Sequence, residues 1–222
     1  MGSKDWAAAV VGLASLASAG CSVFGISDVE QPRYQVVLSE GDREVRRYEG
    51  YLVAKTTVEG PFRRAQGEAF RILAGYIFGA NEARREFAMT APVTQAPAPA
   101  GERMAMTAPV TQTPEGDAWT MAFMMPSEYT LDTLPTPSDP RVRFESVPPK
   151  LVGAIRYAWG AGEERNRAKA RELIDWLADG GDYIPVSAPR FAGYNPPWTL
   201  PFLRRNEMLV DLEPAAGRST VP

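Results

Sequence analysis

The 222-residue sequence predicts an α+β fold with a mainly antiparallel sheet, two long helices and a duplicated strand–helix–strand–strand unit. Three observations support this fold class. Short strand-like runs are numerous, only two stretches show helical periodicity, and similar segments recur about 100 residues apart in the same order. A run of strands that only two helices interrupt is typical of α+β proteins and not of alternating parallel folds.

Ten segments carry strand patterns rich in β-branched and aromatic residues. They are residues 34–39, 43–48, 51–58, 86–93, 104–111, 118–125, 141–147, 150–158, 189–194 and 206–213. Most are short and bounded by glycine, proline or acidic residues, which end strands and form turns.

Both predicted helices present one apolar stripe. In residues 61–78 apolar side chains recur at helical spacing, and arginines lie mostly on the other side. Residues 163–178 repeat this pattern. Pro61 suits a first helical turn and Gly79 suits a helix end, while Glu163 suits the positive N-terminal end of the second helix.

A heptapeptide, Met-Thr-Ala-Pro-Val-Thr-Gln, occurs at residues 89–95 and again 17 residues later at 106–112. The loop between the copies, residues 96–101, is rich in proline and alanine and ends in glycine. We therefore expect a hairpin there. Proline has no amide hydrogen for a ladder, so each copy's proline is expected at an edge, a bulge or a strand end.

A second repetition spans the chain. Residues 51–54 resemble residues 150–153, and the two helical patterns align at an offset of 100. The aligned helical residues are Arg71, Leu73, Tyr76 and Ile77 with Arg171, Leu173, Trp176 and Leu177. We infer two pseudo-repeats, about 34–125 and 141–213, which share one core within a single domain, residues 34–213.

Composition excludes several classes of function. The chain is 45% apolar and 23% charged, as expected for a globular protein with a core, and its net charge of −3 disfavours nucleic-acid binding. It contains no histidine, so the commonest general base, metal ligand and catalytic triad are missing. No spaced carboxylate pair, phosphate loop or dinucleotide fingerprint is evident. We expect a non-enzymatic, monomeric protein with no catalytic residues, no metal site and no nucleic-acid partner.

The N-terminus has the pattern of an export signal. Residues 6–20 are uncharged and rich in alanine, follow Lys4, and are too short for a typical membrane span. Ala19-Gly20-Cys21 resembles the end of a lipobox, which would make the single cysteine, Cys21, the lipidated first residue. We therefore expect a signal peptide at 1–20, a tether at 21–33, a flexible tail at 214–222, and a periplasmic protein lipid-anchored to an envelope membrane. The alternative is cleavage after Ala17-Ser18-Ala19, which would give a soluble periplasmic protein.

Over nearly all of residues 30–213 the sequence resembles the SOUL haem-binding family. Three features carry the resemblance: the duplicated Ala-Met-Thr-Ala-Pro-Val, the run from Phe123 to Pro135, and the run from Tyr194 to Glu207. The resemblance implies a distorted antiparallel barrel or sheet with two flanking helices. It also implies non-catalytic binding of haem or another tetrapyrrole in an apolar surface groove beside a helix. Some members use a histidine to bind iron, and this chain has none.

The candidate binding residues lie mainly on the first predicted helix. A tetrapyrrole needs a flat apolar slot and a cation at its edge for the propionates. The residues we expect to serve these roles are Arg63, Arg64, Phe70, Arg71, Met106 and Trp198. Each also has a plainer role open to it, in the core, on the solvated face or in a structural turn.

Two other functions remain open at this point. A general pocket for amphipathic small molecules, like that of effector-binding domains, would bind unrelated aromatic compounds with comparable affinity. A tetrapyrrole-modifying enzyme would need a proton donor and an acceptor for the iron near the groove. The first function, a haem or porphyrin carrier, buffer or scavenger, best fits the motifs.

Overall fold

The computed structural model describes residues 29–82, 101–160, 162–195 and 199–215. Its strands are β1 (Tyr34–Glu40), β2 (Arg43–Tyr48), β3 (Tyr51–Glu59), β4 (Asn81–Glu82), β5 (Val110–Glu115), β6 (Ala118–Met124), β7 (Thr136–Pro137), β8 (Arg143–Val147), β9 (Lys150–Tyr157), β10 (Tyr183–Pro185), β11 (Arg190–Gly193) and β12 (Asn206–Pro214). Its helices are α2 (Phe62–Ile77), α3 (Glu163–Gly180) and the short 3₁₀ helix η1 (Pro201–Leu203).

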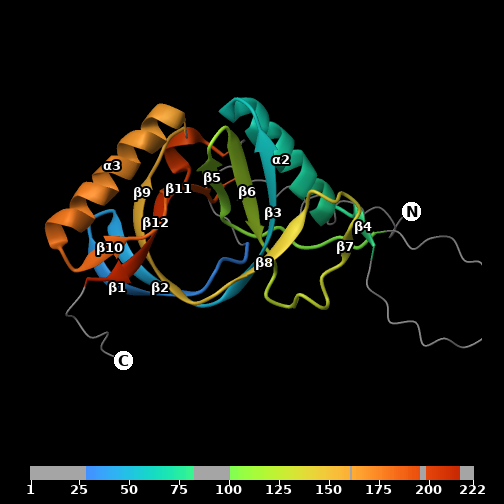
Figure 1. Ribbon diagram of the computed structural model, residues 1–222, viewed down its shortest axis with the longest axis horizontal. Coiled ribbons are helices and arrows are strands. Elements are labelled where there is room, and N and C mark those ends of the chain that lie inside the picture. Colours follow the sequence, from blue (N-terminus) through green and yellow to red (C-terminus); the bar gives the residue numbers. More distant parts are fainter. Residues whose placement is uncertain (1–28, 83–100, 161, 196–198, 216–222) are drawn as a thin grey trace, which may run out of the picture.

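Ten strands form one curled antiparallel sheet in the order β1-β2-β9-β12-β11-β5-β6-β3-β8, with β10 paired to β12. The strands β4 and β7 form a separate pair. Helices α2 and α3 flank the sheet, each beside its own group of strands (Figure 1). The predicted α+β fold is therefore confirmed.

The strand order also shows the duplication. Two units, β3-α2-β5-β6 and β9-α3-β11-β12, have the same order of elements. Outward from the β11–β5 pair, the sheet reads β11-β12-β9-β2 on one side and β5-β6-β3-β8 on the other. The strand that precedes each unit in sequence, β2 or β8, thus pairs with the first strand of the other unit, which ties the two units into one sheet.

Both helices pack on the same face of the sheet. Met208, Phe191, Gln112 and Met121 lie opposite one another on β12, β11, β5 and β6, so their side chains share a face. Met121 belongs to the core under α2, and Met208 to the core under α3. Gly153 on β9 allows α3 to come close, because a Cβ there would meet Leu177 Cδ1 at 3.1 Å.

The opposite face carries a third apolar cluster, which includes Tyr48, Tyr194 and Leu209, with the N-terminal segment packed against it. Beside it, Glu207 is fully buried and accepts hydrogen bonds from Arg46, Arg205 and Tyr194 at 2.7–3.0 Å. Burial opposes ionisation, but the contacts with the two arginines outweigh it and hold the pKa of Glu207 below its ordinary value. The carboxylate of Glu207 and its donors are thus fully paired, and the contact with Arg46 joins β2 to β12.

Several strand predictions need correction. The prediction of a strand over 104–111 is wrong, because β5 begins at Val110, directly after Pro109. Before it, Met104 donates its amide hydrogen to Ile77 of α2 and Ala108 donates to Glu30, so these amides are satisfied without a ladder. Pro109 therefore lies at a strand end, as expected.

The second copy of the heptapeptide ends within a hairpin. Strands β5 and β6 pair across a turn that contains Gly116, whose φ of 59° suits glycine. The predicted hairpin loop at 96–101 and the strand at 86–93 lie wholly or mostly outside the described residues. The strand β10 was not predicted, because three residues are too few to show alternation.

Candidate functional site

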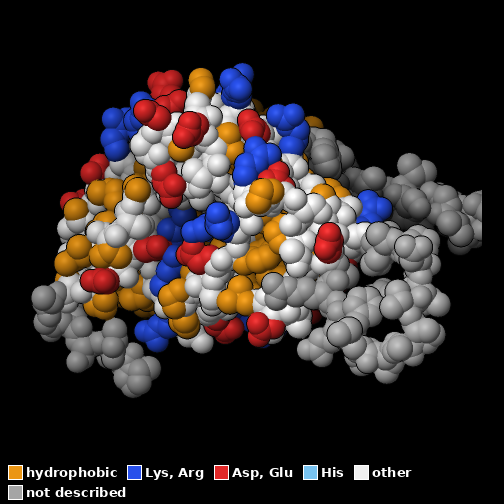
Figure 2. All heavy atoms as spheres, turned by 45° about the vertical axis from the view of Figure 1, so that its right-hand side comes forward, with side chains coloured by type: hydrophobic (Ala, Val, Ile, Leu, Met, Phe, Trp, Pro, Cys, Tyr) orange, Lys and Arg blue, Asp and Glu red, His pale blue; other side chains and the backbone are white. Residues whose placement is uncertain are grey.

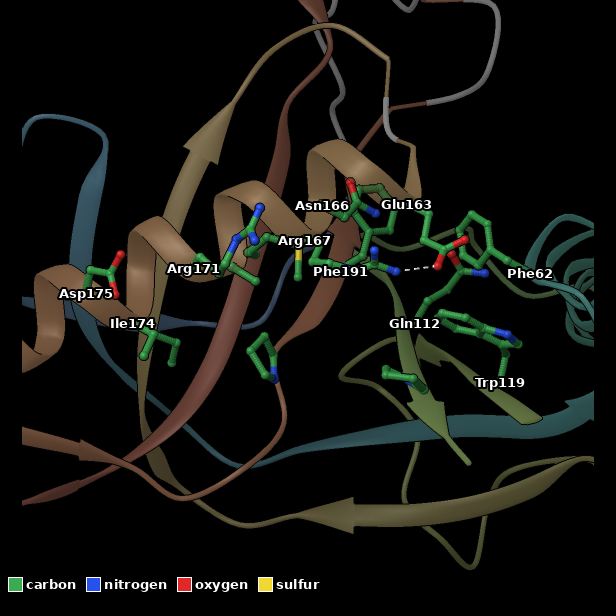
Figure 3. A pocket seen from close by; sticks show the side chains of 14 residues that line it. Phe62, Gln112, Trp119, Glu163, Asn166, Arg167, Arg171, Ile174, Asp175 and Phe191 are labelled. Atoms are coloured by element: carbon green, nitrogen blue, oxygen red, sulfur yellow. Dashed lines mark hydrogen bonds and ion pairs between the residues drawn. The ribbon is translucent and has the colours of Figure 1, made fainter. Parts of the chain in front are cut away.

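A hollow lies between α3 and the sheet, on the face that carries both helices. In Figure 3, side chains of α3 from Asp175 to Glu163 form one wall, and Phe62 and Trp119 lie at the far end. The wall from residue 163 to residue 175 is about 18 Å long at 1.5 Å per residue. The hollow has a volume of about 510 Å³, which falls within the range of about 300–1,000 Å³ that small-molecule sites occupy.

The walls of the hollow are largely apolar and partly aromatic. Residues that supply this surface are Phe62, Pro114, Trp119, Ala170, Ile174, Pro189, Phe191 and Met208. The rings of Phe62 and Trp119 meet edge to face with their centroids 4.7 Å apart, which fixes both side chains at one end. Flat apolar walls of this kind suit a flat apolar guest.

The central strands supply the floor. Met208, Phe191 and Gln112 are opposite one another on β12, β11 and β5, so they form a row across the junction of the two repeats. Strand alternation turns their neighbours, such as Thr111, toward the opposite face. The hollow therefore lies close to the pseudo-symmetry axis, displaced toward α3.

One polar group in the wall has a fixed orientation. Asn166, in the first turns of α3, is 9% exposed and lines the hollow. Its Oδ1 accepts a hydrogen bond of 2.6 Å from the hydroxyl of Tyr157. Burial raises the pKa of Tyr157, so the hydroxyl stays protonated and continues to donate. Asn166 Nδ2 makes no hydrogen bond to any described residue.

A second amide lies in the floor. Gln112 is 3% exposed, and its Oε1 accepts a hydrogen bond of 3.3 Å from Gln66 of α2. Among the described residues, nothing accepts a hydrogen bond from Gln112 Nε2. A buried amide hydrogen without an acceptor costs about 1–3 kcal/mol.

Charged side chains of α3 stand at the rim. Arg167 donates to Glu163 at 2.7 Å, an exposed i,i+4 ion pair. Arg171 follows one turn further along the same wall, and Asp175 follows one turn beyond Arg171. Guanidinium groups at the edge of an apolar slot are suited to pair with ligand carboxylates. Over the face drawn in Figure 2, basic and acidic side chains are interspersed with apolar ones.

A smaller hollow of about 250 Å³ lies on the opposite face of the sheet. Threonines and charged residues supply nearly half of its lining, and most of these charged residues are paired with one another. Lys150 contacts Asp211 at 2.8 Å, Arg190 contacts Asp211 at 2.6 Å, and Lys55 contacts Glu145. An apolar ligand would have to desolvate these pairs, so the larger hollow is the better candidate site.

The ligand-binding residues that the sequence predicted, where the structure describes them, do not line the larger hollow. Arg63, Arg64, Phe70 and Arg71 are exposed on α2, and none of them lines the larger hollow. Phe70 instead packs against Phe123, with the ring centroids 5.6 Å apart. Met106, whose side chain is 36% exposed, does not line the larger hollow either.

Two predicted positions, Trp198 and Cys21, lie outside the described residues. Of the first predicted helix, only Phe62 reaches the larger hollow. The set chosen from the sequence therefore stays a prediction, and the structure brings a different set together.

Sequence reasoning missed Gln112, Asn166 and Phe191. Gln112 ends the second copy of the repeated heptapeptide, which was a usable signal. Asn166 interrupts the apolar stripe of the second helix, and a polar residue on a buried helix face is informative. Phe191 has no signal in the sequence, because its position depends on how β11 joins the two repeats.

Two further findings concern the described residues alone. They contain no group of three or more histidine, cysteine, aspartate or glutamate side chains arranged to hold a metal ion. None of the helices there is both long and apolar enough to span a bilayer.

The fold and the hollow define a class of α+β protein with a ligand-sized apolar hollow beside a helix. The profile of the SOUL heme-binding protein family matches residues 29–211, so the chain belongs to this family. The family is a haem-binding one, which supports tetrapyrrole binding in general. No curated protein matches the sequence at a significant level.

Solved structures share the fold at low identity. The C-terminal domain of EcmrR has a TM-score of 0.53 at 14% identity, over 81% of this chain and 98% of that one. EcmrR in its DNA complex has a TM-score of 0.51 at 13% identity, over 81% and 57%. A hydrolase encoded by lin2189 from Listeria innocua has a TM-score of 0.50 at 10% identity, over 80% and 94%. At these identities the likeness shows the fold alone.

Proposed function

We propose that this protein binds haem or another tetrapyrrole non-catalytically, as a carrier, buffer or scavenger, in the hollow between α3 and the sheet. The observation that carries the proposal is the pairing of family membership with an apolar hollow of about 510 Å³ walled by flat side chains. Burial of a large apolar ring against such walls stabilises the complex by about 25 cal/mol per Å².

The residues of the hollow fit a tetrapyrrole in three respects. Phe191, Ile174 and Trp119 offer apolar surface to the ring. Arg171, and Arg167 beside it, lie where propionates would leave the hollow. Met208 is the lining residue with a sulfur atom that could approach iron, and it is only 4% exposed. The protein's part is to hold the ring and exclude water from its faces.

A matched pair of variants tests the location. Arg171→Glu changes the rim of the hollow, while Arg71→Glu makes the same change at the equivalent position of α2. We expect haemin binding to weaken about fivefold or more in Arg171→Glu, because a carboxylate there repels propionates. Arg71→Glu should leave the affinity unchanged. The measurement is a titration of the purified chain with haemin, followed by the Soret band and by tryptophan quenching.

Three controls and outcomes complete this test. Trp119→Phe should remove much of the quenching, because Trp119 lines the hollow. A fall in affinity in Arg71→Glu alone would move the site to α2, as the sequence predicts. Failure of micromolar haemin and protoporphyrin to change either signal in the unaltered chain would refute tetrapyrrole binding.

We also propose that the protein is exported and anchored in an envelope membrane through a lipid on Cys21. The support is the apolar run at 6–20 followed directly by the single cysteine. Expression with radiolabelled palmitate should label the unaltered protein and leave Cys21→Ser unlabelled. Export with equal lack of label in both would favour the soluble periplasmic alternative.

A further inference from the structure

The polar groups aimed at the hollow form an unusual set, because both buried amides present free donors. Gln112 Nε2 is buried with no acceptor among the described residues. No described residue accepts a hydrogen bond from Asn166 Nδ2, which unlike Gln112 Nε2 is not fully shielded from solvent, and both side chains are at least nine-tenths buried. Their oxygens are already engaged by Tyr157 and by Gln66. The contrast is Glu207, whose Oε1 accepts from Arg46 and Arg205 and whose Oε2 accepts from Arg46 and Tyr194.

The acceptors of the hollow are less available. Of its two carboxylates, Glu163 already accepts from Arg167, and Asp175 stands at the opposite end of the α3 wall. A ligand near Asn166 therefore meets N–H groups and apolar surface. Buried donors are stabilised when a ligand oxygen accepts from them, and a ligand without one leaves them unpaired.

We propose that the hollow selects flat apolar ligands that carry an acceptor oxygen, a carbonyl or carboxylate, on the edge that reaches Asn166. This inference rests on the proposed binding site and narrows the ligand class within it. Asn166 supplies the principal donor, because Tyr157 holds its amide with the oxygen turned to the protein. Gln112 supplies a second donor in the floor. Amines and other ligands that only donate are disfavoured.

Two soluble probes isolate this preference. Anthraquinone-2-sulfonate and anthracene-2-sulfonate have the same three-ring outline and the same anionic group for the rim arginines. They differ in two ring carbonyls. In calorimetric titrations of the full chain, we expect the quinone to bind about fivefold more tightly, the effect of one good neutral hydrogen bond.

Asn166→Asp is the sharpest variant. It keeps the shape of the side chain and an acceptor for Tyr157, while it replaces the donor by a second acceptor. Its charge weakens both anionic probes, so the ratio of the two affinities is the readout. We expect that ratio to fall from about five to one or below. Asn166→Leu, checked for folding by thermal unfolding, should give a ratio near one.

A charge control and the contrary outcomes are straightforward. Gln35→Glu makes an equivalent change on the exposed strand β1 and should leave the ratio at about five. A ratio of one in the unaltered chain, or an unchanged ratio in Asn166→Asp, overturns the inference while the binding site stands. If neither probe nor protoporphyrin binds, the proposed function and the inference fall together.

Discussion

The two long helices are equivalent in the duplicated fold, yet they pack differently against the sheet. Helix α2 buries seven residues against its half of the sheet, and α3 buries three, one of which is Asn166. With the offset of 100, Phe70 of α2 corresponds to Ala170 of α3. Phe70 packs against Phe123, whereas Ala170 lines the hollow.

This difference teaches how one copy of a repeat keeps stability while the other gains a site. A duplicated unit supplies two similar helix–sheet interfaces. At the first interface α2 buries more residues than α3 does at the second, and Phe70 packs on Phe123, so α2 serves mainly to complete the core. Smaller or polar side chains at Ala170 and Asn166 leave the second partly open, and the fold tolerates this because the continuous sheet holds both halves.

Truncation of the equivalent core leucines should show the largest effect. Leu73 and Leu173 are both fully buried. We expect Leu73→Ala to reduce the free energy of unfolding by about 4 kcal/mol, and Leu173→Ala by about 2–3 kcal/mol. The cost is lower at α3 because a helix beside a hollow has more room to settle into the cavity. Urea unfolding measures both values, and a larger loss in Leu173→Ala would contradict the comparison.

The sequence predicted the architecture well for physical reasons. The apolar stripes of both helices and the alternation in β3 report local burial, which is periodic in sequence. The pseudo-repeat was visible in aligned positions such as Leu73 and Leu173. The beginning of β5 was predicted too early. The residues before Pro109 contact α2 through Met104, and such tertiary contacts cannot be read from the local pattern.

Filling the hollow should give the next largest effect. Ala170→Phe places on α3 the side chain that α2 carries at the equivalent position. We expect it to weaken haemin binding by at least tenfold, about 1.4 kcal/mol, because the ring occupies the slot. The thermal midpoint should change little, since apolar surface is covered by apolar surface. The measurement is the haemin titration together with a thermal melt.

Phe70→Ala is the matched control. It opens α2 where Phe70 is 41% exposed, outside the hollow, and should leave haemin affinity within about twofold of the unaltered value. If Phe70→Ala weakens binding more than Ala170→Phe does, the ligand lies on α2 and the comparison of the two helices is reversed.

The site was harder to predict than the fold. The sequence indicated an apolar slot beside a helix with arginines at its edge, and the larger hollow has these parts. It pointed to the first helix because aromatic and basic residues such as Phe70 and Arg71 are denser there. The frequency of these residue types does not show which side chains fill space and which leave it empty. The hollow is lined by Ala170 where α2 carries Phe70, and a small residue gives no signal by itself.

The smallest effect concerns iron. In the proposed complex the hollow contacts the faces and edges of the ring. The residues that line it include no histidine or cysteine to bind iron strongly. We therefore expect haemin and metal-free protoporphyrin to bind with affinities within about twofold, as measured by quenching of Trp119. Met208→Leu should shift the haemin spectrum slightly, while Met106→Leu, outside the hollow, should shift nothing. If the chain strongly prefers haemin and Met106→Leu removes that preference, the iron lies on the α2 side. The larger hollow beside α3 would then bind a different ligand.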